Sequence, residues 1–292
     1  MASPEIPHLH DTSGGSAASA SGSGIGLWLH RSNRVEELVE ALAGVVARPG
    51  PDVFASECIA VQGRGMERWL SMELSRRLGV WANPEFPFPR RLVERALDAV
   101  LGEVPESGLA FDPERLLWSV AELLPGLSRR PEFAPVARYL EGDEGARARL
   151  QLAERIAQTF DHYVVYRPEM VLEWERGGGD DWQALLWRAL VERHGSGSLA
   201  RRAHDFFAAV EGGQGPPVGF PTRLCFFGVS TLPPLYVSIL AALSRRLELH
   251  LFLPSPSREY WADIRSRLEI HRAHGRREGE GIPGYDLEDA PA

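Results

Sequence analysis

The sequence predicts an α/β fold in which a parallel sheet is interrupted by a large helical insertion. Two observations predict the sheet. Over residues 58–89 an apolar run meets a glycine turn and then a helical pattern, and over residues 222–253 two apolar runs flank one helix. A third observation, helical spacing through residues 90–210, predicts the insertion between the two parts of the sheet.

The first element of the sheet is expected at residues 27–30, and a helix with a buried stripe from Val35 to Val46 follows it. The loop at residues 30–34 is where a helicase-type fold carries its phosphate-binding loop. Here that loop contains neither glycine nor lysine. The whole chain lacks lysine, so its 32 basic residues are all arginine.

The second strand is expected at residues 58–61, before a glycine turn at residues 62–65 and an amphipathic helix that begins near Met66. Strand, glycine turn and helix in this order form the local geometry that cradles phosphates. Gly63 and Gly65 match only two glycines of a dinucleotide fingerprint, and no Gly-Lys-Ser or Gly-Lys-Thr occurs. The sequence therefore predicts the shape of a nucleotide-binding fold without its phosphate-binding residues.

The second part of the sheet is expected as a strand at residues 224–228, a helix at residues 233–246 and a strand at residues 247–253. Ligands of open α/β sheets lie at the carboxyl ends of strands, where a Walker B acid would stand. Residues 228–230 contain no Asp or Glu. Without a Walker lysine or acid, we expect no nucleotide hydrolysis on this chain.

The predicted organisation has five parts. Residues 1–24 are rich in Ser, Gly and Ala and are expected to form a disordered leader. Residues 25–89 and 221–266 are expected to be the two parts of the α/β domain, and residues 90–220 the helical insertion. Residues 267–292 are charged, contain Gly and Pro, and are expected to be an unstructured tail.

The composition is that of a soluble globular protein, with 44% hydrophobic and 25% charged residues. The net charge of -8 argues against a free-standing DNA-coating protein, although a local arginine cluster can still bind nucleic acid. Cys58 and Cys225 lie in apolar runs, which is typical of core cysteines in a reducing compartment. No run is long and apolar enough to span a membrane, so we expect a cytoplasmic protein.

Candidate catalytic residues are few. Asp161 and His162 are adjacent on a predicted helix and point about 100° apart, so they do not face each other. Asp180 and Asp181 precede a helix, where capping explains them. Ser230 lacks the pattern of a nucleophile elbow. The sequence therefore predicts no catalytic site and no metal site on this chain.

A binding surface is the remaining prediction. Gln62, Arg64 and Arg68 lie on or just after the glycine turn. Further arginines and aromatic residues extend this lining, namely Arg76, Arg77, Arg90, Arg91, Trp81, Phe86 and Phe88. Arginine interleaved with aromatic residues suits single-stranded nucleic acid, with guanidinium on phosphate and ring on base. The spacing alone is equally compatible with a solvated helix face beside a hydrophobic loop.

Six runs of the sequence resemble, in family order, the N-terminal part of the RecC family, the gamma subunit of exodeoxyribonuclease V. They are LWLHRSNRVEELVEAL, AVQGRGMERWLSMELSRRLGVWANPEFPFP, FDHYVVYRPEMVLEWE, DWQALLWRALV, FFGVSTLPPLYVSILAAL and LHLFLPSPSREYWADI. They cover residues 27–264, and the tail after Arg267 does not resemble the family. The family's subunit is much longer, so the chain resembles a truncated form or fragment.

The resemblance implies a degenerate superfamily 1 helicase-like fold that has lost its ATPase motifs. It implies a heterotrimer with RecB-like and RecD-like subunits, which use ATP and Mg, while this chain needs no cofactor. It also implies binding of duplex-end and single-stranded DNA. The subunit would guide unwound single strands and sense the Chi signal during double-strand break repair by homologous recombination.

The resemblance also assigns site residues. Gln62 falls on the family's Chi-reading surface, and Arg64, Arg68 and Phe88 fall on neighbouring positions of it. Arg64 and Arg68 replace smaller or neutral polar residues of some relatives, which leaves the recognised sequence open. Two other readings remain, a stand-alone α/β enzyme with an unrecognised active site and an inactive truncation product.

Overall fold

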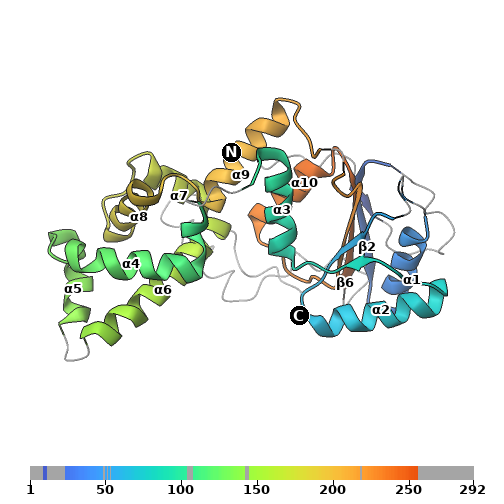
Figure 1. Cartoon of the computed structure of the whole chain (residues 1–292), viewed down its shortest axis with the longest axis horizontal. Coiled ribbons are helices and arrows are strands. Elements are labelled where there is room, and N and C mark those ends of the chain that lie inside the picture. The colour runs from blue at the N-terminus through green and yellow to red at the C-terminus, as the bar shows by residue number, and fades with distance from the viewer. Residues whose placement is uncertain are drawn as a thin grey trace, which may run out of the picture.

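The computed structural model describes residues 9–11, 24–48, 50, 52, 54–103, 108–141, 145–217 and 219–255. The described part has an α/β lobe and a helical lobe, at the right and left of Figure 1, with α3, α9 and α10 between them. The predicted class, α/β with a parallel sheet, is confirmed.

The sheet has six strands, and every pairing between neighbouring strands is parallel. The strands are β1 (Leu9–Asp11), β2 (Gly26–Ser32), β3 (Glu57–Ala60), β4 (Pro84–Glu85), β5 (Arg223–Phe227) and β6 (Glu248–Pro254). Their order in the sheet is β1-β2-β6-β5-β3-β4. The last two described strands, β5 and β6, therefore lie in the middle of the sheet, between β2 and β3.

The helices cover both faces of this sheet and build the helical lobe. They are α1 (Val35–Val46), α2 (Arg64–Leu78), α3 (Pro89–Leu101), α4 (Pro113–Leu127), α5 (Ala134–Leu140), α6 (Gly145–Tyr166), α7 (Pro168–Glu175), α8 (Trp182–His194), α9 (Leu199–Glu211) and α10 (Pro234–Leu243). Two 3₁₀ turns, η1 (Gly108–Phe111) and η2 (Pro131–Phe133), connect some of them. Asp181 caps α8, because its carboxylate accepts the N–H groups of Gln183 and Ala184, as the sequence predicts.

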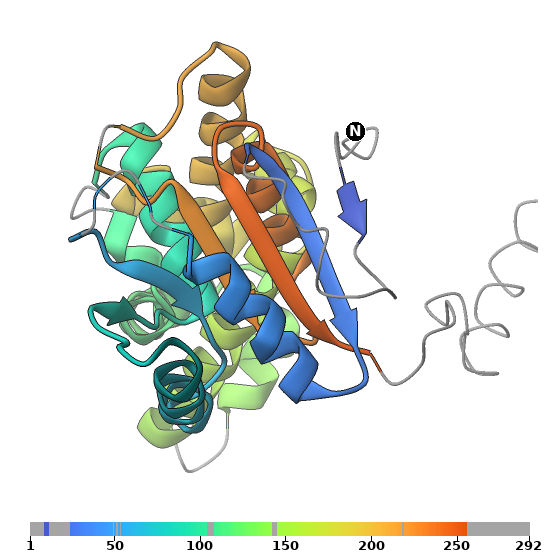
Figure 2. The same ribbon diagram turned by 90° about the vertical axis from the view of Figure 1, so that its right-hand side faces the viewer.

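The central strands are buried on both faces, which explains their unbroken apolar runs. Along β3, Ile59 packs against α1 and α2, whereas Cys58 and Ala60 belong to the core on the opposite face. Figure 2 shows α1 in front of the sheet and most other helices behind it. Cys58 and Cys225 are buried and free, and burial raises the pKa of the Cys58 thiol to about 12. Their prediction as core cysteines is confirmed.

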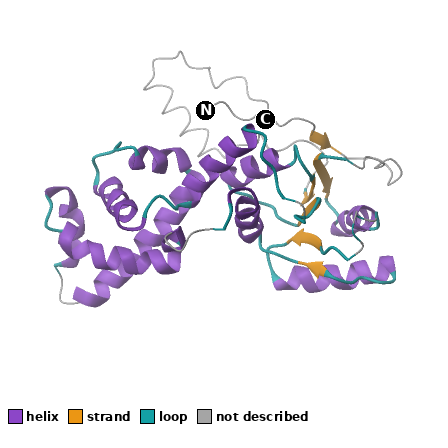
Figure 3. Ribbon diagram, turned by 45° about the horizontal axis from the view of Figure 1, so that its top comes forward, coloured by secondary structure: helices purple, strands orange, loops and turns teal. Residues whose placement is uncertain are grey.

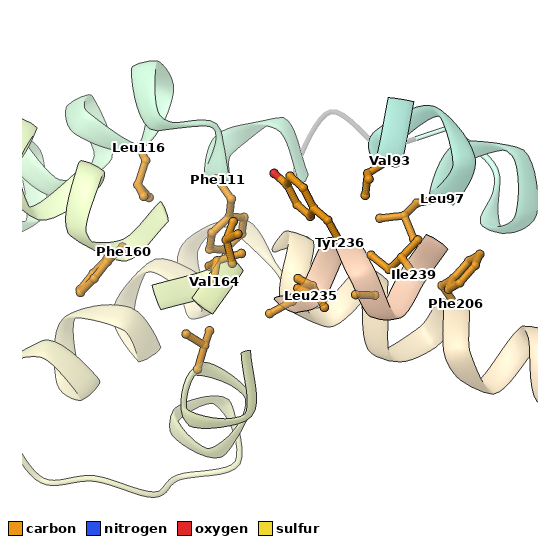
Figure 4. Packing of buried hydrophobic residues seen from close by; sticks show 14 of the residues in the cluster. Val93, Leu97, Phe111, Leu116, Phe160, Val164, Phe206, Leu235, Tyr236 and Ile239 are labelled. Atoms are coloured by element: carbon orange, nitrogen blue, oxygen red, sulfur yellow. The ribbon is translucent and has the colours of Figure 1, made fainter. Parts of the chain in front are cut away.

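The helical lobe is joined to the sheet by a continuous apolar core. All described elements between β4 and β5 are helical, and Figure 3 shows no strand in that lobe. Phe160 and Val164 of α6 belong to the same buried cluster as Tyr236 and Ile239 of α10 (Figure 4). The lobes therefore share one core, and the proposed division into domains stays a prediction.

The predicted disordered leader is wrong for residues 9–11, which form β1 and pair with β2. A strand in a Ser- and Gly-rich segment has no periodicity that would predict it. The other leader residues before residue 24, the predicted tail at residues 267–292 and residues 256–266 lie outside the described residues. Among the helices that the structure describes, none has the length and apolar character to cross a membrane.

Two buried histidines link β2 to β6. His30 Nε2 lies 3.0 Å from His250 Nδ1, and His250 Nε2 lies 2.8 Å from a carboxylate oxygen of Glu248. Since Glu248 accepts the Nε2–H of His250, Nδ1 of His250 is left to accept from His30. Burial, and then the charges of His250 and Arg48, lower the pKa of His30 to about 4. Both rings are therefore neutral near pH 7.

Replacing Ile239 by Ala should lower the free energy of unfolding by about 2–4 kcal/mol, because the side chain is fully buried between helices. Val237 lies on the same helix but is 39% exposed, so Val237→Ala should change stability by less than about 0.5 kcal/mol. Urea denaturation of both variants measures this difference. Equal losses would show that α10 does not hold the two lobes together.

The histidine pair should make stability depend on pH. Above pH 6.5 His30 is neutral in both the folded and the unfolded chain. Below pH 6.5 His30 becomes protonated in the unfolded chain, whereas in the folded chain it stays neutral down to about pH 4. Stability should therefore fall as the pH falls from 7 to 5, and His30→Phe should remove about 2 kcal/mol of that fall. Denaturation at both pH values measures it, with the exposed His204→Gln as control. An unchanged pH slope in His30→Phe would contradict this role.

Candidate nucleic-acid interface

The loops that follow β3 and β4 lie side by side at the carboxyl edge of the sheet. The backbone N–H of Val61 donates to the carbonyl oxygen of Pro87 at 3.1 Å. Gln62 and Phe88 are the next residues of the two loops, and both are exposed, Phe88 by 55%. The fold thus brings Gln62 and Phe88, far apart in the chain, to neighbouring positions.

This place is a topological switch point of the sheet. β3 and β5 are neighbours, but α2, which follows β3, packs on one face and α10, which follows β5, packs on the other. In open α/β sheets, ligands bind at the carboxyl ends of strands where such a change of face occurs. Gln62 at the end of β3 and Gly228 at the end of β5 border this position.

The backbone conformation at the end of β5 favours glycine at position 228. Its φ is +68°, in the left-handed region, and its N–H donates to the carbonyl of Phe252 at 2.9 Å. A Cβ at this position would lie 3.4 Å from Cε of Met66 in the first turn of α2. The end of β5 and the start of α2 therefore approach each other closely.

The predicted arginines fall into two groups. Arg64 and Arg68 are exposed, lie one turn apart on α2, and form no ion pair or hydrogen bond through their side chains with any residue the structure describes. Arg76 is exposed but lies 2.6 Å from Glu73, and Arg77 bonds both Glu73 and Glu40. Only Arg64 and Arg68 thus present unshared guanidinium groups beside Gln62.

Arg90 belongs to the second group. Its guanidinium lies 2.7 Å from Asp161 and 2.9 Å from Glu94. Burial lowers the pKa of Arg90, but the two carboxylates raise it by more, so the pKa lies above its usual range. Arg91 is mostly exposed, 3.6 Å from Glu94. No local sequence pattern predicts the contact with Asp161, because 71 residues separate the partners.

A small cavity of about 90 Å³ adjoins Arg90. Asp161, Asp98 and Arg202 also line it, and Arg202 lies 2.8 Å from Asp98. The indole N–H of Trp187, a fully buried side chain of the lining, has no hydrogen-bond partner among the described residues. Sequence reasoning missed Asp98, Arg202 and Trp187, since only the tertiary fold brings them beside Arg90.

The predicted aromatic residues also fall into two groups, those packed against the core and one that is exposed. Trp81 and Phe86 pack against the core formed with α1 and α2, so only Phe88 offers an exposed ring beside Gln62.

The Asp161 and His162 side chains contact different partners: Asp161 bonds Arg90, and the His162 ring packs edge-on against Tyr166. No cluster of three or more metal-ligating side chains occurs within the described ranges.

Arg90 and Arg64 should differ in their effect on stability. Arg90→Ala leaves the partly buried Asp161 without its partner and should cost about 1 kcal/mol, a modest value because 35% of the Arg90 side chain is exposed. Arg64→Ala removes no contact of this kind and should stay within about 0.5 kcal/mol. Chemical denaturation of the two variants measures the difference. A larger loss in Arg64→Ala would mean that Arg64 has a structural role.

Comparison with known proteins identifies the family. Residues 27–283 match the family described as RecC, N-terminal domain. The RecBCD enzyme subunit RecC of Escherichia coli is 36% identical over 252 residues, covering 82% of this chain and 22% of that protein. The subunit from Haemophilus influenzae is 32% identical (85% of this chain, 25% of that protein). The subunit from Mycolicibacterium smegmatis is 34% identical (82% and 22%).

The chain thus spans only 22 to 25% of the length of these relatives. The family match also runs past Arg267 to residue 283, so the prediction that the resemblance ends near Arg267 was wrong. The match includes all strands from β2 to β6 and every described helix, and β1 lies before it. The chain therefore belongs to the family of RecC N-terminal domains.

Proposed function

We propose that this chain is a non-catalytic DNA-binding part of a RecBCD-type exodeoxyribonuclease V. In this proposal its fold is a helicase-like one that has lost the residues of ATP hydrolysis. The parallel sheet with helices on both faces supports the likeness. The loss of ATPase chemistry is supported by the loop after β2, residues 30–34, which lacks glycine and lysine, and by the absence of an acid at residues 228–230.

One observation carries the DNA-binding proposal. Two unshared arginines, Arg64 and Arg68, an exposed amide, Gln62, and an exposed ring, Phe88, gather at the switch point of the sheet. The first backbone N–H groups of α2 have no partner within the helix, and its amino end favours negative charge. All these features suit a strand of phosphates whose bases remain accessible.

Each residue type has a separate task in this proposal. The guanidinium groups of Arg64 and Arg68 contact phosphates, and the ring of Phe88 stacks on a base. The amide of Gln62 reads a base edge, which would give the surface its response to Chi. Arg76 and Arg90 extend the lining, but each must first exchange a carboxylate for a phosphate. We therefore rank them below Arg64 and Arg68.

The proposed setting is that of the relatives, named as subunits of the RecBCD enzyme. RecB-like and RecD-like subunits would be the partners in the cytoplasm, would use ATP and Mg, and would carry the helicase and nuclease activities. This chain would guide the unwound single strand during double-strand break repair by homologous recombination. Its own residues bind and orient the strand, and no catalytic step is assigned to them.

The DNA-binding proposal can be tested with the full chain and a labelled single-stranded oligonucleotide. The double variant Arg64→Ala/Arg68→Ala should weaken binding and reduce the salt slope of log K by about 0.7 for each lost phosphate contact. Phe88→Ala should lose about 1–3 kcal/mol of binding free energy through lost stacking. Gln62→Ala should change sequence preference more than mean affinity. Fluorescence anisotropy at several salt concentrations and with several sequences measures all three effects.

Arg245→Ala/Arg246→Ala is the charge-matched control, because it also removes two arginines, and both are exposed just before β6, at the opposite edge of the sheet. Its salt slope should equal that of the wild type. If the Arg64→Ala/Arg68→Ala variant keeps the wild-type affinity and slope, the surface is a solvated helix face and the proposal fails. A slope lowered equally in Arg245→Ala/Arg246→Ala would show diffuse electrostatic attraction without a site.

A further inference from the structure

The loop after β5 is a third part of the carboxyl edge at which Gln62 and Phe88 lie. In the sheet, β3 lies between β4 and β5, so the loops that follow these three strands are neighbours. Gln62 and Gly228 each come two residues after a paired position of β3 and β5. The chain then continues through Ser230 and Thr231 to the start of α10. The loop of Gln62 is therefore flanked by the loop of Phe88 and by the loop of Ser230 and Thr231.

The two hydroxyl groups of the loop after β5 serve no described structural contact. Ser230 and Thr231 are both exposed, and neither side chain forms a hydrogen bond with any residue that the structure describes. Other hydroxyls of the chain stabilise helices. Ser198 caps α9, and Thr159 and Ser244 donate to backbone carbonyls near their own positions. The hydroxyls of Ser230 and Thr231 are thus available to a ligand.

The loop after β5 is held in place at both of its ends. Gly228 has the left-handed φ of +68°, and its N–H donates to the carbonyl of Phe252 at 2.9 Å. The next side chain, Val229, is buried. At the other end, Pro233 and Pro234 fix their own φ angles and lead into α10. A ligand that binds Ser230 and Thr231 therefore pays little entropy for ordering the loop.

The three neighbouring loops carry no negative charge. Residues 61–65, 86–88 and 228–233 contain no Asp or Glu, although the whole chain has 40 acidic residues and a net charge of -8. Arg64 supplies positive charge in the first of these loops, and Arg68 follows it one turn later on α2. An edge with arginines, free hydroxyls and no carboxylate suits a ligand that carries phosphates.

We propose that Ser230 and Thr231 are phosphate-contacting residues of the strand-binding surface. Their hydroxyls donate to phosphate oxygens of a single strand that crosses the three loops, while Gln62 is left to read a base. Neighbouring β-strands lie about 4.8 Å apart, so the three loops extend over roughly 10 Å of the bound strand. This inference rests on the proposed DNA-binding function and adds two positioning residues to it.

The test removes the hydroxyls and keeps the charge of the surface. Ser230→Ala/Thr231→Val is compared with Ser56→Ala/Thr222→Val, which removes the same two groups from exposed residues just before β3 and β5, at the opposite edge of the same strands. Ser230→Thr/Thr231→Ser, which keeps both hydroxyls, is the conservative variant. Each full chain is titrated against a labelled single-stranded oligonucleotide by fluorescence anisotropy, at several salt concentrations and with several sequences. Urea denaturation checks that all variants unfold at the wild-type midpoint.

The expected result has three parts. Ser230→Ala/Thr231→Val should bind at least about fivefold more weakly, because two hydrogen bonds to charged groups are lost. The loss should be the same for every sequence, since phosphates carry no sequence information. The salt slope should equal that of the wild type, because neutral hydroxyls release no counterions. The opposite-edge and conservative variants should stay within about twofold of wild type.

The Arg64→Ala/Arg68→Ala variant, measured in parallel, separates this inference from the proposed function. If that variant loses affinity and slope while Ser230→Ala/Thr231→Val binds like the wild type, the surface binds DNA and the role of the hydroxyls is overturned. A loss that differs between sequences would overturn it too, because the hydroxyls would then read bases. If neither variant loses affinity, the proposed function and this inference both fail.

Discussion

The parallel pairing of β5 with β3 and of β6 with β2 is the constraint on which the rest of the structure depends. It closes the sheet only after the chain has passed through the whole helical lobe. It places α2 and α10 on opposite faces of neighbouring strands and so creates the switch point. The position of Gln62, Phe88 and Gly228 at one edge follows from this pairing and from the bond between Val61 and Pro87.

The helical lobe depends on the same core. Phe160 of α6 and Ile239 of α10 are buried in one apolar cluster that reaches Phe226 of the sheet. Charged contacts supplement it at the boundary, where Arg90 of α3 bonds Asp161 of α6. The ion pairs of Arg90, Arg76 and Arg77 serve the fold, whereas Arg64 and Arg68 serve no described contact. This division separates structural arginines from those available to a ligand.

The sequence predicts those elements whose burial leaves a pattern. The central strands are apolar runs because both faces are covered, and α1 shows a clear buried stripe. The two-residue β4 leaves no pattern, since its register with β3 alone defines it. The strand β1 is hidden in a leader of Ser and Gly for the same reason. The sequence predicts Gln62, Arg64, Arg68 and Phe88 as one binding surface. The carboxylate partner of Arg90 is not predictable, because the contact with Asp161 depends on the tertiary fold and leaves no local pattern.

The strand order also has a kinetic consequence. His30 and His250 lie 220 residues apart in the chain yet touch across β2 and β6. A ribosome that adds 5–20 residues per second needs roughly 10–30 s between β3 and β5. During that interval β2 and β3 lack their central partners, and their apolar faces and open edges are exposed to other chains. Nonlocal pairing of this kind forms slowly, so the late synthesis of β5 and β6 sets the earliest time at which the sheet can close.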